Sequence, residues 1–180
     1  MTVPKNGFRA SVRPALEADI PALTDIKGLG SEAIHRDRLR DAQDAGFQYL
    51  VLLADQEVIG FACLVHRRPS YWSDADDMQN LPQIVDLQVK ESQRGHGYGS
   101  DFIHALERIA AEAGSAYLYL SVEPGNNRRA YALYRRLGYQ PVQSKPYRKI
   151  WSFTDCQGNV HSGEDWVLDL VKPLPAQAAD

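Results

Sequence analysis

The sequence predicts an α/β domain, and three observations support this prediction. Apolar, β-branched runs alternate along the chain with stretches of helical periodicity. A glycine-rich turn at residues 94–100 lies between a predicted strand and a predicted helix. The length of 180 residues and the hydrophobic content of 44% fit one domain with its own core. We therefore expect residues 1–180 to form a single domain, with residues 173–180 as a flexible tail.

A strand and two helices are predicted at the start of the chain. Residues 8–13 form the strand, and residues 17–26 form a short helix with Pro21 in its first turn, where proline is tolerated. Ser31 can cap a second helix that runs to about residue 45, and Gly46 ends it.

An antiparallel hairpin and a loop are predicted next. Residues 47–54 and 58–65 are apolar runs that only three polar residues separate. Residues 66–82 show no periodicity, so we expect a polar loop there, containing Asp74, Asp76 and Asp77.

Strands and helices alternate in the second half of the chain. The helix that follows the glycine-rich turn has an apolar side and ends at Gly114, and a later helix ends at Gly138, where glycine suits the left-handed conformation. The predicted strands are residues 84–89, 116–122, 150–154 and 166–171, and the later helix spans residues 127–137.

The segment Gln-Arg-Gly-His-Gly-Tyr-Gly-Ser, residues 93–100, has the features of a phosphate-binding loop. Glycines let the backbone approach an anion, and the following helix points its free N–H groups and its positive dipole end at that anion. The dinucleotide pattern fails because Ser100 or Phe102 stands where its third glycine is needed. The nucleotide triphosphate loop fails because no lysine follows Gly99. A tight turn without a ligand is the structural alternative.

Two motifs in this half resemble one enzyme family. Arg94-x-x-Gly97-x-Gly99 resembles the acyl-coenzyme A pyrophosphate loop of the GCN5-related N-acetyltransferases, the GNAT family. The run Asn127-x-x-Ala130-x-x-Leu133-Tyr134-x-x-x-Gly138-Tyr139 resembles that family's fourth helix, in the right order and at a helix-length separation. Residues 8–20 resemble its first strand and helix, so the resemblance covers most of the chain. It implies a mixed, mostly antiparallel central sheet with splayed fourth and fifth strands and helices on both faces.

The resemblance also implies a binding site for acetyl-coenzyme A as co-substrate. Its pantetheine arm would pair with backbone where the strands at residues 84–89 and 116–122 separate, and one backbone N–H there would be the oxyanion donor. Capping of its own helix would alone explain Asn127. Arg128 and Arg129 either reach the 3′-phosphate or are merely solvated. The predicted cofactor-binding residues are Leu87, Val89, Arg94, Gly95, His96, Gly97, Tyr98, Gly99, Ser100 and Asn127.

Two residues are predicted to move protons. Tyr134 matches the family's tyrosine that protonates the departing thiolate, although it also belongs to an apolar helix stripe and could serve packing alone. Asp86, on the predicted strand beside the reaction centre, is the candidate base that deprotonates the acceptor amine. A structural ion pair of Asp86 with a nearby Arg or Lys, or a water chain as the base, are the alternatives.

The sequence says least about the identity of the acceptor. We expect a primary amine of a small molecule, enclosed by residues 28–35 and 146–166, which contain His35, Tyr147, Trp151 and Trp166. These aromatic residues could equally fill the core. The functional alternatives are an acyl-coenzyme A sensor without catalysis, a protein N-terminal or lysine acetyltransferase, and a nucleotide-phosphate binder outside the family.

Charge, hydropathy and cysteine content limit the partners, the location and the metal ligands that we expect. The net charge of −3 and the scattered basic residues argue against nucleic acid as a partner. We find no apolar run of signal-peptide or membrane-span length and expect a cytoplasmic protein. Cys63 and Cys156 lack metal-ligand spacing, so no metal is expected. A homodimer stays open.

Overall fold

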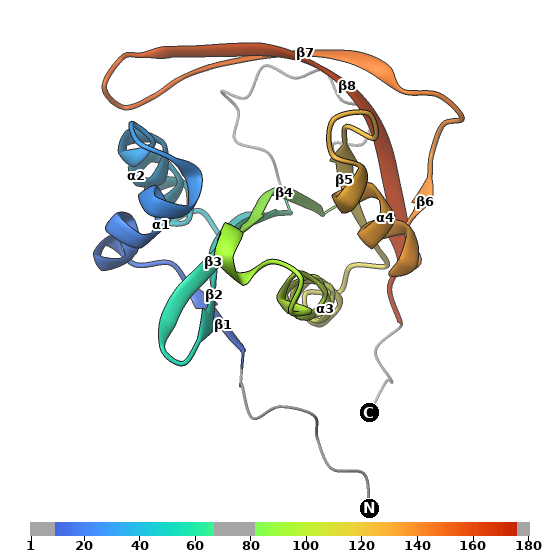
Figure 1. Cartoon of the computed structure of the whole chain (residues 1–180), viewed down its shortest axis with the longest axis horizontal. Coiled ribbons are helices and arrows are strands. Elements are labelled where there is room, and N and C mark those ends of the chain that lie inside the picture. The colour runs from blue at the N-terminus through green and yellow to red at the C-terminus, as the bar shows by residue number, and fades with distance from the viewer. Residues whose placement is uncertain (1–9, 67–81, 176–180) are drawn as a thin grey trace, which may run out of the picture.

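The computed structural model describes residues 10–66 and 82–175 of the chain (Figure 1). The predicted acidic loop with Asp74, Asp76 and Asp77 lies outside these residues, as do the start of the first predicted strand and most of the expected tail.

A mixed sheet forms the centre of the molecule. Its strand order is β1-β2-β3-β4-β5-β8-β6, with β7 pairing to β8, and every neighbouring pair is antiparallel except β4 and β5. This confirms the expected fold class. The strands are β1 (Ser11–Pro14), β2 (Phe47–Ala54), β3 (Glu57–Val65), β4 (Gln83–Val89), β5 (Tyr117–Val122), β6 (Gln140–Pro141), β7 (Tyr147–Thr154) and β8 (Val160–Pro173).

The parallel strands β4 and β5 separate soon after they meet. They pair only at Gln83 with Tyr119 and at Ile84 with Leu120, and both strands then continue without pairing to each other. The predicted splay of the fourth and fifth strands is thus confirmed. It leaves backbone groups of β4 facing a gap, which a ligand with amide groups can fill.

Helices cover both faces of the sheet (Figure 1). On one face, α3 (Tyr98–Glu112) and α4 (Arg128–Arg136) supply Phe102, Leu106 and Tyr134 to the larger apolar core. On the other face, α1 (Ile20–Lys27) and α2 (Glu32–Asp41) pack Leu23 and Leu39 against β2 and β3. The two 3₁₀ turns are η1 (Glu17–Asp19) and η2 (Glu91–Gln93). None of the described helices is long and apolar enough to cross a membrane.

The second helix differs from its predicted form at both ends. Ser31 occupies the cap position, but its hydroxyl donates to the Gly28 carbonyl at 2.7 Å and makes no capping bond. The helix ends at Asp41, four residues before the predicted end, because Asp44 accepts a hydrogen bond from the Gly46 N–H and turns the chain.

The last two long strands form a ribbon that extends far beyond the predicted lengths. The β7–β8 ribbon runs across one side of the molecule, and its tip lies beside α2 (Figure 1). There the Cys156 N–H donates to Asp37 at 2.8 Å, and the Cys156 Sγ donates to the Ala33 carbonyl at 3.6 Å. Asp155 braces the turn by accepting hydrogen bonds from the backbone N–H groups of Gln157 and Asn159. The ribbon is therefore tied to the helical layer at its far end.

Candidate active site

The glycine loop has the backbone geometry that an anion site needs. Gly95 and Gly97 adopt φ values of +88° and +94°, in the left-handed region that favours glycine. The helix α3 begins immediately after, at Tyr98, so its first backbone N–H groups face the loop. The glycine-rich segment predicted this arrangement of turn and helix.

The basic side chains near the loop take different positions. Arg94 turns back along the chain, and its Nε donates to the Val89 carbonyl at 2.9 Å. The exposed His96 ring lies 3.3 Å from the Gln93 carbonyl. Arg129, from α4, lies against the loop, since its Nη2 would stand 3.3 Å from a β-carbon built on Gly95. The loop therefore has cationic groups from two segments of the chain beside it.

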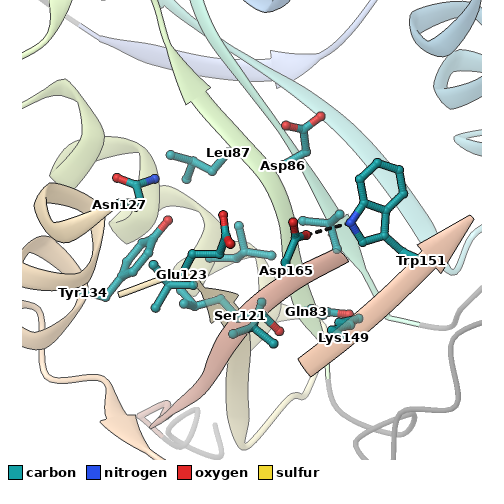
Figure 2. Close-up of a pocket in the computed structure, with 15 residues that line it drawn as sticks. Gln83, Asp86, Leu87, Ser121, Glu123, Asn127, Tyr134, Lys149, Trp151 and Asp165 are labelled. Carbon is teal, nitrogen blue, oxygen red and sulfur yellow. Dashed lines mark hydrogen bonds between the residues drawn. The ribbon is translucent and has the colours of Figure 1, made fainter. Parts of the chain in front are cut away.

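A cleft of about 370 Å³ opens where β4 and β5 separate (Figure 2). Its walls come from β4, from β5 and the residues after it, from α4, and from the β7–β8 ribbon. The lining residues include Asp86, Leu87, Ser121, Glu123, Asn127, Tyr134, Lys149, Trp151 and Asp165. Two of the predicted cofactor-binding residues and both predicted catalytic residues are among them.

Tyr134 lies on α4 with its hydroxyl directed into the cleft (Figure 2). Its ring packs edge to face against Tyr139, with the centroids 6.0 Å apart. Burial raises the pKa of Tyr134 to about 12, so the hydroxyl holds its proton throughout the neutral range. The side chain is thus part of the core and presents a protonated hydroxyl to the cleft.

Asn127 lines the cleft from the start of α4. Its side-chain oxygen accepts a hydrogen bond from the Ala130 N–H at 3.2 Å, so the residue caps its helix as expected.

Asp86 is held by three partners. Its Oδ2 accepts from Lys27 at 2.6 Å and pairs with Arg38 at 2.5 Å, and its Oδ1 accepts from Gln88 at 2.7 Å. Burial alone would raise the pKa of this carboxyl, but the charges of Arg38 and Lys27 outweigh that effect and hold the pKa well below its usual range. This arrangement favours the structural ion pair that the sequence analysis kept as an alternative to a base.

Two carboxylates of the cleft, those of Glu123 and Asp165, were not predicted as parts of the reaction centre. Glu123 follows β5 directly, and its place four residues before Asn127 could have indicated it. Asp165 and Trp151 come from facing strands of the ribbon, and the Trp151 Nε1 donates to Asp165 Oδ2 at 2.7 Å. Their approach depends on strand register, which has no local sequence signal.

The other aromatic residues expected near the acceptor lie elsewhere. The Trp166 side chain is 58% exposed and does not line the cleft. His35 is fully buried, where its ring lies 3.1 Å from the Ser31 Oγ and 2.7 Å from the Tyr49 hydroxyl. Of the predicted aromatic lining, Trp151 alone faces the cleft among the described residues.

In residues 10–66 and 82–175, no group of three or more His, Cys, Asp or Glu side chains is arranged to hold a metal ion.

The chain matches the family model described as Acetyltransferase (GNAT) family over residues 16–139. It therefore belongs to the GNAT family of acetyltransferases, as the two sequence motifs predicted. A search of curated proteins finds no match.

Solved structures of acetyltransferases share the fold. A ribosomal-protein-alanine N-acetyltransferase from Brucella melitensis is 22% identical, with a TM-score of 0.64, and the match covers 91% of this chain and 99% of that one. A phosphinothricin acetyltransferase from Sinorhizobium meliloti in complex with acetyl-CoA is 21% identical, with a TM-score of 0.64 and coverage of 95% and 92%. A putative acetyltransferase from Salmonella typhimurium with its cofactor acetyl-CoA is 19% identical, with a TM-score of 0.63 and coverage of 96% and 98%. At these identities the likeness shows the fold alone.

Proposed function

We propose that this chain, acting as a single acyltransferase domain, transfers an acetyl group from acetyl-coenzyme A to a primary amine of a small molecule. The amine attacks the thioester directly, with no acetylated enzyme intermediate. The observation that carries the proposal is the cleft at the β4–β5 splay, which the Tyr134 hydroxyl faces and which lies beside the strand leading to the glycine loop.

The proposed cofactor site follows the chain from β4 to α3. The backbone of Leu87 and Val89 pairs with the pantetheine arm, because β4 has no strand partner on its β5 side beyond Ile84. The pyrophosphate binds at the start of α3, where backbone N–H groups and the helix dipole favour an anion. Asn127 contacts the cofactor as well as capping α4. The loop residues assigned to the pyrophosphate are Arg94, Gly95, His96, Gly97, Tyr98, Gly99 and Ser100.

Tyr134 is the proposed acid for the leaving thiolate. A hydroxyl with a pKa near 12 keeps its proton at neutral pH, and it donates a hydrogen bond to the sulfur as negative charge develops there. The proton passes to the sulfur as coenzyme A leaves, and solvent restores it to the tyrosine.

The amine must lose a proton before it attacks. Asp86 remains the candidate base from the sequence, but its lowered pKa and its three partners favour a second carboxylate, that of Glu123. Glu123 lines the same cleft, and its carboxylate Oε1 accepts a hydrogen bond from the Asn126 side chain at 3.3 Å. We propose that Glu123, directly or through a water molecule, takes the proton.

The walls of the cleft support a small cationic acceptor. Trp151 offers an aromatic face and Asp165 a carboxylate, both of which attract an ammonium group. The ribbon that carries them is tied to α2 through Cys156. A wall held in this way favours a compact acceptor over a protein tail.

An acceptor screen tests the proposal. The full chain is incubated with acetyl-coenzyme A and a panel of small amines, amino acids, aminoglycosides and peptide N-termini, and free thiol is measured. We expect thiol release that depends on a small amine. Release with peptide N-termini only would refute the small-molecule acceptor. Binding of acetyl-coenzyme A without release by any amine would indicate the sensor.

A further inference from the structure

The strand β4 contains a bulge beside the cleft. In the β3–β4 register Gln88 pairs with Phe61 and Val85 pairs with Cys63, so β4 has one residue more than β3 across this interval. Asp86 lies within the bulge and adopts φ of +50°, a left-handed conformation that costs a residue with a side chain about 1 kcal/mol or more. Bulges redirect backbone and side-chain groups, and this one immediately precedes Leu87 in the cleft wall. A strained conformation of this kind persists only where the surrounding structure imposes it.

Two helices supply the groups that hold the bulge. Lys27 is the last residue of α1 and Arg38 lies in the last turn of α2, and both contact the Asp86 carboxylate. The side chains are mostly buried, with exposed fractions of 21% for Lys27, 15% for Arg38 and 18% for Asp86. Both cations also lie over the ring of Phe61, the β3 residue opposite the bulge. The carboxylate is therefore fixed from two directions above the strained backbone.

The orientation of the Asp86 carboxylate distinguishes a catalytic base from a residue that supports the backbone. Figure 2 shows its carboxylate directed away from Tyr134 and Glu123, on the side of the strand that faces the first helices. A base needs a free oxygen near the amine and a pKa near the working pH. Asp86 has hydrogen bonds or ion pairs on both oxygens.

We propose that Lys27, Arg38 and Asp86 form an ion-pair clamp that fixes the β4 bulge and thereby aims the backbone N–H of Leu87 at the thioester carbonyl oxygen of the donor. Asp86 is then a positioning residue, and Lys27 and Arg38 act on the reaction without touching either substrate. The inference rests on the proposed function, because the thioester oxygen is the group that the N–H would bind.

The clamp can be tested by ligand binding as well as by turnover. Coenzyme A lacks the acetyl carbonyl, so the ratio of its Kd to that of acetyl-coenzyme A reports on the hydrogen bond to that oxygen. A hydrogen bond of this kind contributes about 0.5–1.5 kcal/mol, or roughly 2- to 10-fold in Kd. We expect Lys27→Gln and Arg38→Met to reduce the ratio by that factor, while the Kd of coenzyme A itself stays the same.

Turnover supplies the second readout. Loss of one oxyanion donor lowers kcat by about 10²-fold or more. We expect a decrease of that order in Lys27→Gln with the acidic limb of the pH profile unmoved. Lys27→Arg keeps the charge and should restore much of both the ratio and kcat.

Two results would overturn the clamp. If Asp86 is the base, Lys27→Gln removes a cation that lowers its pKa, so the acidic limb moves to higher pH and the Kd ratio stays at the wild-type value; this outcome overturns the clamp. Folded variants with wild-type ratio and kcat overturn it as well. If Arg38→Met does not fold, the comparison of Lys27→Gln with Lys27→Arg still tests the clamp. If the wild-type protein acetylates no amine, the proposed function fails, and the Kd ratio tests the clamp on its own.

Discussion

Gly163 lies directly opposite Trp151 in the β7–β8 register, and the indole ring occupies the space above it. A β-carbon built on Gly163 would stand 2.7 Å from the Trp151 Cε2, closer than atoms can approach. The absence of a side chain thus lets the ring lie across β8, where its Nε1 reaches Asp165. One wall of the cleft depends on this pair.

We therefore expect Gly163→Ala to displace the indole and break its hydrogen bond to Asp165. If the acceptor binds against Trp151, its KM should rise by about 10-fold, the scale of a lost contact of 1 to 2 kcal/mol. The Kd of acetyl-coenzyme A should not change, because the glycine loop lies on other elements. Gly125→Ala is the matched control, since a β-carbon there meets no atom within 4 Å. An unchanged acceptor KM would show that the acceptor does not use this wall.

Removal of the Tyr134 hydroxyl tests the acid. Tyr134→Phe keeps the ring that packs against Tyr139 in the core, so the fold should be retained. General acid catalysis contributes about 10²- to 10⁴-fold, and we expect kcat to fall within that range. Calorimetry should find the Kd of acetyl-coenzyme A within about 3-fold of wild type, a difference below 1 kcal/mol. Turnover at the wild-type rate would leave Tyr134 with packing alone.

The left-handed backbone at Gly97 should be needed for tight binding of acetyl-coenzyme A. Gly97 has φ of +94°, where a residue with a β-carbon destabilises the backbone conformation by about 1 to 2 kcal/mol. This holds although no atom lies within 4 Å of the position that the β-carbon would take. Gly97→Ala should therefore distort the loop and raise the Kd of acetyl-coenzyme A by about 10-fold. Gly114→Ala introduces a similar strain at φ of +85° at the other end of α3 and should lower stability without this effect. Equal Kd values in the two variants would argue against a phosphate at the loop.

The glycine loop and the helices α3 and α4 could be predicted from the sequence because their determinants are local. The glycines, the helix after them and the Asn127–Tyr139 run each depend on residues within one or two turns of one another. The left-handed conformation at Gly138, with φ of +95°, confirms the predicted helix end. Such features follow from backbone sterics and helix geometry.

The ion pairs of Asp86 and the ribbon wall of the cleft could not be predicted, because contacts between distant segments create them. Lys27 meets Asp86 across 59 residues of chain, and no pattern near either residue indicates that pair. The ribbon was predicted too short for a related reason. In its outer part the apolar residues Ile150 and Val160 lie on the exposed face, whereas polar residues such as His161 and Asp165 lie on the partly buried face, so the apolar-inward alternation that identifies a strand packed on a core is missing there.

The buried His35 should make stability depend on pH. Burial, with added repulsion from Arg38 and Lys27, lowers the pKa of His35 to about 4, whereas the unfolded chain has a value near 6.5. Between these values the unfolded state binds a proton that the folded state excludes. The free energy of unfolding should therefore fall as pH decreases from about 6.5 toward 4, with a slope of up to about 1.4 kcal/mol per pH unit.

Urea unfolding of wild type and His35→Gln at pH 7, 5.5 and 4.5 checks this expectation. His66, whose pKa burial also lowers, contributes in the same window in both proteins, so the difference between them isolates His35. Glutamine can still hydrogen-bond to Ser31 or Tyr49 but cannot titrate. We expect a large deficit of the variant at pH 7 that shrinks by about 1 kcal/mol or more by pH 4.5. Parallel losses in the two proteins would mean that folding does not lower the pKa of His35.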